Sequence, residues 1–398
     1  MRKIEQSLSL ELGTVTLLFL AAALTGVTLG AHAQTFTSLY SFQCQPDGDG
    51  PWGSLTLDAA GNLYGTTFGG GNYDLGTVFK ISPQGVETIL HHFTGADGAN
   101  PQNVNLVFDA AGNLYGTTIF GGPNSNGGVV FKLEPDGTET TLHNFRGPDG
   151  EAPHGLSIDQ GGNLYGTTAL GGLYRHCAFF SSCGTVFKIT TKGTETLYKF
   201  TGSPGPSTPD IGVTLDPEGN LYGTSEYGGT EGYGTVFEVN SAGYETVLLN
   251  LHGTAGQYPI SGLLRTAGGR LYGTSYEGAA SDKGAVWKID GPGKATVLHQ
   301  FGGAPDGAGP VGTLIEDSAG QLFGTTANGG TGQCNLGCGT IYEISAAGVE
   351  SVLYSFPDQN GGFAPEAGLV MGSAGNLYGT TKDGGNGTGC GTVFKYTP

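Results

Sequence analysis

The pentapeptide Leu-Tyr-Gly-Thr-Thr at residues 63–67 decides the fold, because close copies of it return six more times along the chain. The copies begin at residues 114, 164, 221, 271, 322 and 377, so the spacings are 51, 50, 57, 50, 51 and 55 residues. Self-similarity at a fixed period of this length is typical of solenoids and propellers. The sequence therefore predicts seven copies of one structural unit.

Each unit contains four short segments of β-branched and aromatic residues, bounded by Gly, Asn, Asp and Pro, which predict strands. We call them A, B, C and D in chain order. In the first unit they are Leu55–Asp58, Leu63–Thr67, Thr77–Ile81 and Glu87–Phe93. The 76 Gly residues argue against long helices, because each interior Gly destabilises a helix by about 1 kcal/mol. Four strands in about 50 residues predict an all-β, seven-bladed propeller with four antiparallel strands per blade.

The two chain ends are expected to share the last blade. The chain stops at Pro398 directly after strand C of the seventh unit, which therefore lacks a strand D. Phe36–Phe42 reads Phe-Thr-Ser-Leu-Tyr-Ser-Phe and closely matches Ser351–Phe356, the strand D of unit six. We predict that this N-terminal strand completes the seventh blade and closes the ring, which removes an exposed sheet edge.

Six cysteines in an exported chain allow fifteen pairings, and the repeat alignment selects one of them. The cysteines that directly precede the Gly opening a strand C are Cys183, Cys338 and Cys390. Cys177 and Cys334 lie in the B–C loops of their own units, which predicts Cys177–Cys183 and Cys334–Cys338. The remaining pair, Cys44–Cys390, forms only if the ring closes. A zinc site at Cys334 and Cys338 is the alternative, but no second ligand pair at matching spacing completes it.

Residues 1–33 have the pattern of a cleavable secretory signal. Arg2-Lys3 precedes the apolar stretch Val15–Leu29, and Ala31-His32-Ala33 forms a small-x-small cleavage site. We expect cleavage near Ala33, which leaves residues 34–398 as a single propeller domain. The alternative is a retained membrane anchor, which the short apolar run disfavours. No other stretch approaches the ~20 apolar residues of a membrane span.

The charge balance excludes several classes of partner. The chain has 34 acidic and 16 basic residues, for a formal net charge of −18. Nucleic-acid binders need clustered Lys and Arg to neutralise phosphates, so we expect no nucleic-acid partner. The chain has no Walker or dinucleotide glycine box and no Gly-x-Ser-x-Gly motif, and we expect no cofactor. We expect a monomer.

One column of the alignment varies directly after a constant Pro. Every D–A loop contains a Pro, and the residue after it differs from unit to unit. These seven residues are Trp52, Gln102, His154, Asp210, Ile260, Val311 and Glu366. Strand A is innermost in a propeller, so we expect them to ring one mouth of the central channel. A variable insert in a constant frame favours a ligand-binding ring, and a solvated mouth that tolerates any residue is the open alternative.

The longest and most variable loops lie on the same side as this ring. D–A and B–C loops leave one end of each sheet, and variable loops on a rigid scaffold commonly carry function. The aromatic residues on this side are Trp52, Tyr73, Phe120, Tyr174, Phe179, Phe180, Tyr227, Tyr233, Tyr258 and Phe363. Aromatic rings beside acids and amides suit sugars, which stack on rings and hydrogen-bond through hydroxyls. We therefore expect a glycan or a protein ligand, although packing within the loops is an ordinary use of several of these rings.

Catalysis is the alternative function. A glycosidase needs two carboxylates roughly 5–10 Å apart, for which Asp210 and Glu366 are the candidates, with His154 as an acid or base. A structural component of the cell surface is a third interpretation. The repeated residues are interpreted as structural. Gly65 and its equivalents are expected to allow tight packing between neighbouring blades. Asp58 and its equivalents are expected to hydrogen-bond the backbone of their own turn and not to bind calcium, so we expect no metal site.

The boxes Asn-Leu-Tyr-Gly-Thr-Thr, Gly-Thr-Val-Phe-Lys and Glu-Thr-x-Leu-Tyr-x-Phe closely resemble the bacterial GloVer tandem-repeat family, named for Gloeobacter and Verrucomicrobia. The resemblance covers essentially all of residues 36–398. It implies an exported repeat protein, and it assigns no catalytic residue because the biochemical role of the family is not established. Members often carry a C-terminal surface anchor. This chain departs from that pattern by ending at Pro398, so release to the periplasm or medium is expected.

Overall fold

The computed structural model describes residues 34–123, 126–177, 180–190, 192–358, 361–385, 387 and 389–398. The N-terminal segment interpreted as a secretory signal, with its cleavage site near Ala33, lies outside these residues. Residues Gln34–Pro398 form one compact unit. Within the described ranges, no helix is long and apolar enough to cross a membrane.

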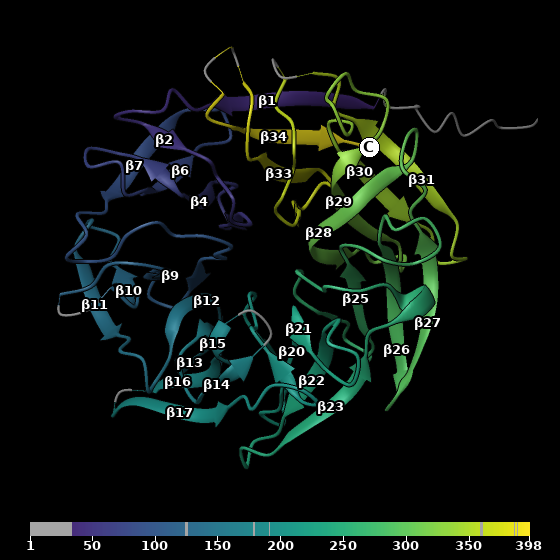
Figure 1. Ribbon diagram of the computed structural model, residues 1–398. Coiled ribbons are helices and arrows are strands. Elements are labelled where there is room, and N and C mark those ends of the chain that lie inside the picture. The colour runs from purple at the N-terminus through teal and green to yellow at the C-terminus, as the bar shows by residue number, and fades with distance from the viewer. Residues whose placement is uncertain are drawn as a thin grey trace, which may run out of the picture. The chain divides into compact units, whose positions relative to one another are not determined.

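Seven four-stranded antiparallel sheets are arranged around a central axis as a seven-bladed propeller (Figure 1). Blade 1 contains β3 (Thr56–Leu57), β4 (Leu63–Thr67), β6 (Thr77–Ile81) and β7 (Glu87–His92). Blade 2 contains β8 (Val107–Phe108), β9 (Leu114–Thr118), β10 (Val129–Leu133) and β11 (Glu139–Asn144). Blade 3 contains β12 (Glu151–Ile158), β13 (Leu164–Leu170), β16 (Thr185–Thr190) and β17 (Gly193–Lys199).

The other four blades repeat this order. Blade 4 contains β19 (Thr214–Leu215), β20 (Leu221–Ser225), β22 (Thr235–Val239) and β23 (Glu245–Asn250). Blade 5 contains β24 (Leu264–Arg265), β25 (Leu271–Ser275), β26 (Ala285–Gly291) and β27 (Lys294–Gln300). Blade 6 contains β28 (Gly307–Glu316), β29 (Leu322–Gly329), β30 (Thr340–Ile344) and β31 (Glu350–Ser355). Blade 7 contains β32 (Val370–Met371), β33 (Leu377–Thr381), β34 (Thr392–Thr397) and β1 (Thr35–Ser41).

Short elements decorate the loops between these strands. The two-stranded pairs are β2 (Gly48–Asp49) with β5 (Gly69–Gly70), β14 (Tyr174–Cys177) with β15 (Phe180–Ser182), and β18 (Pro206–Ser207) with β21 (Tyr227–Gly228). A 3₁₀ turn, η1 (Gly253–Ala255), lies after β23. All of them belong to D–A or B–C loops, so the additional structure gathers at one end of the blades.

The ring closes through the N-terminal strand, as predicted. β1 pairs with β34 in antiparallel register from Thr35 opposite Thr397 to Ser41 opposite Thr392. In Figure 1, β1 lies along the outer edge of blade 7, beside β34 and β33. A disulfide between Cys44 and Cys390, with Cα atoms 5.4 Å apart, joins the two segments covalently. The seventh blade is therefore built from both ends of the chain.

The other cysteines form the two local pairs that the alignment selects. Cys177–Cys183 and Cys334–Cys338 have Cα separations of 5.2 and 5.1 Å, and each lies in a B–C loop. The described residues include no free cysteine. Disulfides form and persist in oxidising compartments, so these three bonds are consistent with an exported protein.

The Gly of each Leu-Tyr-Gly-Thr box is needed within its own blade, which corrects the expectation of a contact between blades. Gly65 lies opposite Phe79 in the β4–β6 pair, and a Cβ at Gly65 would lie only 2.6 Å from Cζ of that ring. The ring of Phe79 then meets Phe42 of the preceding blade edge to face, with centroids 5.0 Å apart. The same ring pair recurs as Phe93–Phe131 and Phe200–Phe237. Gly thus makes room for the aromatic residue that joins successive blades.

The constant residues of the D–A loops hold neighbouring blades together at the channel mouth. A Cβ at Gly76, which precedes strand C of blade 1, would lie 2.7 Å from Cδ of Pro101 in the next D–A loop. The same contact closes the ring between Gly391 and Pro51, at 2.5 Å. These Gly residues have positive φ angles, for example 93° at Gly76, which other residues rarely adopt. The Pro column is therefore part of the frame that positions the variable residue after it.

The turns at the opposite end of the blades are uniform. Asp58 accepts hydrogen bonds from the backbone N–H groups of Ala60 and Asn62, and from the side chains of Asn62 and Tyr64. Burial alone would raise the pKa of Asp58, but these hydrogen bonds hold it below its usual value. Asp109, Asp159 and Asp216 make the same four bonds. Their carboxylates are satisfied by their own turns, as expected.

Candidate functional site

A cavity of about 490 Å³ opens at the end of the central channel where the D–A loops meet. Small-molecule sites commonly have volumes of roughly 300–1,000 Å³, so this cavity has the size of a binding site. It is lined by residues of every blade, mostly from the segment that leads into strand A. In blade 1, strand A pairs with strand B only at Thr56 and Leu57, and the lining residues Trp52 and Ser54 precede these two positions.

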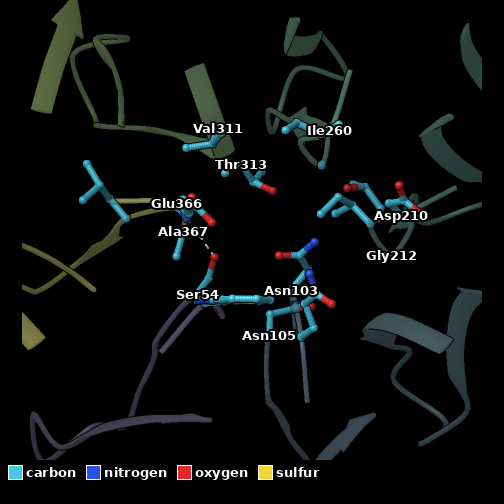
Figure 2. A pocket seen from close by; sticks show the side chains of 18 of the residues that line it. Ser54, Asn103, Asn105, Asp210, Gly212, Ile260, Val311, Thr313, Glu366 and Ala367 are labelled. Atoms are coloured by element: carbon cyan, nitrogen blue, oxygen red, sulfur yellow. Dashed lines mark hydrogen bonds between the residues drawn. The ribbon is translucent and has the colours of Figure 1, made fainter. Parts of the chain in front are cut away.

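Six of the seven ring residues line this cavity: Trp52, Gln102, Asp210, Ile260, Val311 and Glu366. Figure 2 shows Asp210 and Glu366 on opposite sides of it, with Ile260 and Val311 along one edge between them. Asn103 and Asn105 lie across from that apolar edge, and Gln102 precedes them in the same loop. The cavity thus has two acidic sides, one apolar side and one amide-rich side.

His154 is the exception among the ring residues. It does not line the cavity and is only 5% exposed, so it is a buried residue of blade 3. Blade 3 has one residue fewer between its loop Pro and its turn Asp than blade 1, and β12 extends through this segment to pair His154 with Thr167. Burial lowers the pKa of His154 to about 4, although a hydrogen bond to the backbone of Gln102 partly offsets that effect. His154 therefore does not lie at the cavity wall, where the ring was expected to place it.

A second variable column, which the sequence reasoning missed, contributes to the same wall. It is the residue directly after each Gly-Thr-Thr or Gly-Thr-Ser box. Its seven members are Phe68, Ile119, Ala169, Glu226, Tyr276, Ala327 and Lys382. Glu226, Tyr276 and Ala327 line the cavity, and Phe68 and Lys382 contact Trp52 behind it. The signal was visible in the alignment, since this variable position directly follows the most constant segment of the repeat.

Blade 4 brings two carboxyl groups together. Asp210 of the D–A loop and Glu226 after β20 are hydrogen-bonded through their side chains, and both line the cavity. Burial, together with the Glu226 carboxyl beside it, raises the pKa of Asp210 well above its usual value. The raised pKa keeps the Asp210 carboxyl group protonated to a higher pH than a free carboxyl group. The pair offers a hydrogen-bond donor and several acceptors at the cavity wall.

Blade 7 places a carboxyl group beside a base instead. Nζ of Lys382 lies 3.4 Å from Oε1 of Glu366 and 4.7 Å from the ring centroid of Trp52. Burial raises the pKa of Glu366, and Lys382 partly offsets the increase. The Trp52 ring also stacks on Phe68, with centroids 4.4 Å apart. Trp52 is therefore already engaged by two protein neighbours, and an incoming sugar ring would compete with them.

Three of the aromatic residues predicted on this face gather beside the acid pair of blade 4. The ring centroid of Tyr258 lies 5.6 Å from that of Tyr227 and 6.1 Å from that of Tyr233. Tyr227 also hydrogen-bonds Glu226 through its side chain. Elsewhere on this face, Tyr73 and Phe120 are exposed at 60% and 42% and stand apart from the cavity lining. Phe179 and the side chains of Tyr174 and Phe180 lie outside the described structure.

Two clusters among the described residues have the composition of a metal site. The first, Cys44, Asp49 and Cys390, contains the ring-closing disulfide, whose sulfurs are not thiolates. The second is His299, Asp306 and Glu350, where Nε2 of His299 lies 3.1 Å from Oδ2 of Asp306. The same His–Asp contact recurs at His91–Asp97 and His143–Asp149. Its recurrence indicates a loop contact of the repeat, and we assign neither cluster to a metal.

Several solved structures share the fold of this chain. A streptogramin B lyase aligns with a TM-score of 0.62 and 14% identity, over 92% of this chain and 97% of the lyase. The extracellular domain of a B. thetaiotaomicron protein described as a one-component system aligns with a TM-score of 0.57 and 13% identity, over 92% and 42%. A puromycin hydrolase aligns with a TM-score of 0.51 and 14% identity, over 83% and 50%. At these identities the likeness extends to the propeller fold alone.

The sequence comparisons concern the repeat itself. No curated protein sequence matches the chain. The Gloeobacter/Verrucomicrobia repeat matches residues 24–180 and 177–394, which together cover nearly all of the propeller. The chain therefore belongs to the Gloeobacter/Verrucomicrobia repeat family.

Proposed function

We propose that this chain is an exported, monomeric propeller that binds a glycan in the cavity at the mouth of its central channel. The observation that carries the proposal is the cavity lining, in which carboxyl, amide and apolar side chains from separate blades converge on about 490 Å³. Sugars need polar partners for their hydroxyls and apolar surface for their C–H faces, and this lining offers both. The contacts between the constant Pro and Gly residues hold together the loops that carry these side chains.

A binding screen with a matched pair of variants tests the proposal. A panel of soluble oligosaccharides is titrated against the oxidised protein by isothermal titration calorimetry. Gln102→Ala removes an amide from the cavity wall, and we expect a loss of affinity of about 10-fold, the equivalent of one or two hydrogen bonds. Gln84→Ala, in the exposed C–D turn of blade 1, is the control and leaves the affinity unchanged. Absence of binding by every glycan, or equal effects of both variants, would contradict glycan binding.

Export and the monomeric state have separate tests. The three disulfides and the likeness to an extracellular domain support export. When the full chain is produced in a bacterium, we expect the protein outside the cytoplasm with Gln34 as its first residue, as found by N-terminal sequencing. Light scattering is expected to give the mass of one chain. A larger mass would favour the structural surface component instead.

A second candidate function, hydrolysis of a glycan, is favoured by one observation, the hydrogen-bonded carboxyl pair of blade 4. Such a pair can give and take a proton at the same place. Asp210 meets Glu226 in this pair, whereas Glu366 lies across the cavity and is bonded to Lys382. Hydrolysis predicts new reducing ends that disappear in Asp210→Asn and persist in Glu366→Gln. A screen that detects binding and no product would contradict hydrolysis and support the binding function.

A further inference from the structure

The charges around the cavity are unequally balanced. The described residues that line it include three carboxyl groups, Asp210, Glu226 and Glu366, and no Lys, Arg or His. Glu366 has the Lys382 ammonium within 3.4 Å. The pair Asp210–Glu226 has no ion pair with a base among the described residues. The negative charge of the cavity is therefore concentrated on the side of blade 4.

The groups around the acid pair are aromatic or acidic. Tyr227 donates to Glu226, and Tyr258 and Tyr233 pack next to Tyr227 in turn. Glu277 and Asp282 of the next B–C loop act on Tyr258 through their charges. Tyr276 lines the cavity beside them. Aromatic faces and carboxylates both attract cations, so these neighbours of the pair favour a positively charged ligand group.

The pair itself has the geometry to hold an ammonium group. The side chains of Asp210 and Glu226 are hydrogen-bonded, and burial raises the pKa of Asp210 well above its usual value, which favours a proton in that contact. An ammonium group has three N–H donors and can take the place of that proton while bonding to both carboxylates. On the neighbouring side, Gln102 and Asn103 offer amides to ring hydroxyls. The cavity thus combines a cation-binding side with a polyol-binding side.

We propose that the blade 4 side of the cavity, formed by Asp210 and Glu226, binds the ammonium group of an amino sugar. The inference rests on the proposed glycan-binding function and names its ligand class. Because the incoming ammonium replaces the proton shared by the two carboxyl groups, binding releases about one proton to the buffer. Affinity therefore rises with pH until the amine of the ligand itself loses its proton.

Calorimetry with two matched ligands tests the inference. The probes are the tetrasaccharide of β-1,4-linked glucosamine and its fully N-acetylated counterpart, which keeps the hydroxyls and lacks the charge. We expect the amine form to bind at least about 10-fold more tightly, the equivalent of a charge-assisted hydrogen bond. Titrations in two buffers of different ionisation enthalpy are expected to show release of about one proton.

Variants separate the acid pair from the general charge of the protein. Asp210→Asn and Glu226→Gln keep the size of the side chains, and each is expected to remove both the preference for the amine and the proton release. Glu218→Gln removes one negative charge from the exposed A–B turn at the opposite end of the same blade. This control variant is expected to keep the preference for the amine and the proton release. Circular dichroism verifies that each variant is folded.

The outcomes distinguish this inference from the proposed function. Equal affinity for the two tetrasaccharides, or no proton release, would overturn the amino-sugar assignment while glycan binding stands. Tighter binding of a lysine-rich peptide than of the amino sugar would also overturn it, in favour of a protein ligand. If no glycan binds at all, both proposals fall. Preference for the amine that survives in Asp210→Asn and Glu226→Gln would place the cation site elsewhere.

Discussion

Blades 4 and 7 have opposite chemistry at the same two repeat positions beside the cavity. In blade 4 the positions hold Asp210 and Glu226, and in blade 7 they hold Glu366 and Lys382. Both bring a carboxyl group to the cavity wall, on opposite sides (Figure 2). Only in blade 7 is the partner a base, which partly offsets the effect of burial on the carboxyl group. The residue directly after the Gly-Thr-Thr or Gly-Thr-Ser box therefore decides whether the carboxyl group of a blade has a basic partner.

The two blades also differ in how the chain builds them. Blade 4 is one continuous segment, whereas blade 7 joins strands from the two chain ends through β1 and the Cys44–Cys390 bond. A continuous blade keeps its fourth strand by its own short turn. A composite blade must overcome the entropy of bringing the two chain ends together. Closure of the ring therefore depends on the contacts between β1 and β34 in blade 7.

The largest effect is expected from opening blade 7. Replacement of both Cys44 and Cys390 by Ala lowers the free energy of unfolding by up to about 5 kcal/mol, since the bond closes a very long loop. Replacement of Cys334 and Cys338, which close a short loop, costs about 2 kcal/mol. Urea unfolding of the two double variants under non-reducing conditions measures the difference. Equal losses would show that ring closure does not depend on the covalent bond.

Converting blade 4 into a copy of blade 7 is the second way to test the comparison. Glu226→Lys places a base beside Asp210, and we expect the affinity for the glucosamine tetrasaccharide to fall about 100-fold, as for the loss of a buried charge pair. Glu238→Lys makes the same change of charge on β22, where blades 1, 2, 3, 5 and 7 already have Lys. That control is expected to bind normally. A similar loss in both variants would mean that net charge, and not the pair, governs binding.

His154 sharpens the comparison because it occupies the ring column of blade 3 without lining the cavity. Its pKa of about 4 in the folded protein lies below the ~6.5 of an unfolded chain, so the unfolded state binds more protons between these values. The associated stability is complete above pH ~6.5 and is lost as the pH falls through about 4. We expect wild type to lose about 2–3 kcal/mol more than His154→Gln over that interval in urea unfolding. Parallel pH profiles would contradict a buried neutral histidine.

Asp210→Asn is expected to act with the opposite sign. The pKa of Asp210 is raised in the folded protein, so its contribution to stability is present below its unfolded pKa and is lost as the pH rises through the folded value. The Asn variant lacks this loss, so its stability relative to wild type is expected to increase as the pH rises through the folded pKa of Asp210. Thermal unfolding at several pH values measures the gain. A variant that is less stable than wild type at every pH would contradict the shared proton.

The smallest effect is expected from Lys382→Met in blade 7. Both partners of the Glu366–Lys382 pair are about one-third exposed, and such pairs contribute less than about 1 kcal/mol. We therefore expect the free energy of unfolding to change by less than that amount and the affinity for the amino sugar by less than about threefold. Lys395→Met on β34 is the control. A loss above about 2 kcal/mol would show that Lys382 supports Trp52 and the closure of the ring.

The repeat period made most of the fold predictable. β4 and β6 have the predicted bounds, and the D strand of blade 7 comes from the N-terminal end as the near-identity of Phe36–Phe42 and Ser351–Phe356 indicated. The seven copies made the prediction firm, because the equivalent residues of every copy must fit the same backbone position. The column after the loop Pro was visible for the same reason, and six of its residues do line the cavity.

Only the tertiary structure decided how these residues meet. The extension of β12 includes His154, which is buried in blade 3, and the pairing of Asp210 with Glu226 joins two columns that lie 16 residues apart in the chain. Aligning the seven repeats identifies the residue at each repeat position of this chain. Burial, neighbouring charge and the direction of a side chain arise from the packing of separate blades, and these determine protonation and therefore the chemistry of the mouth.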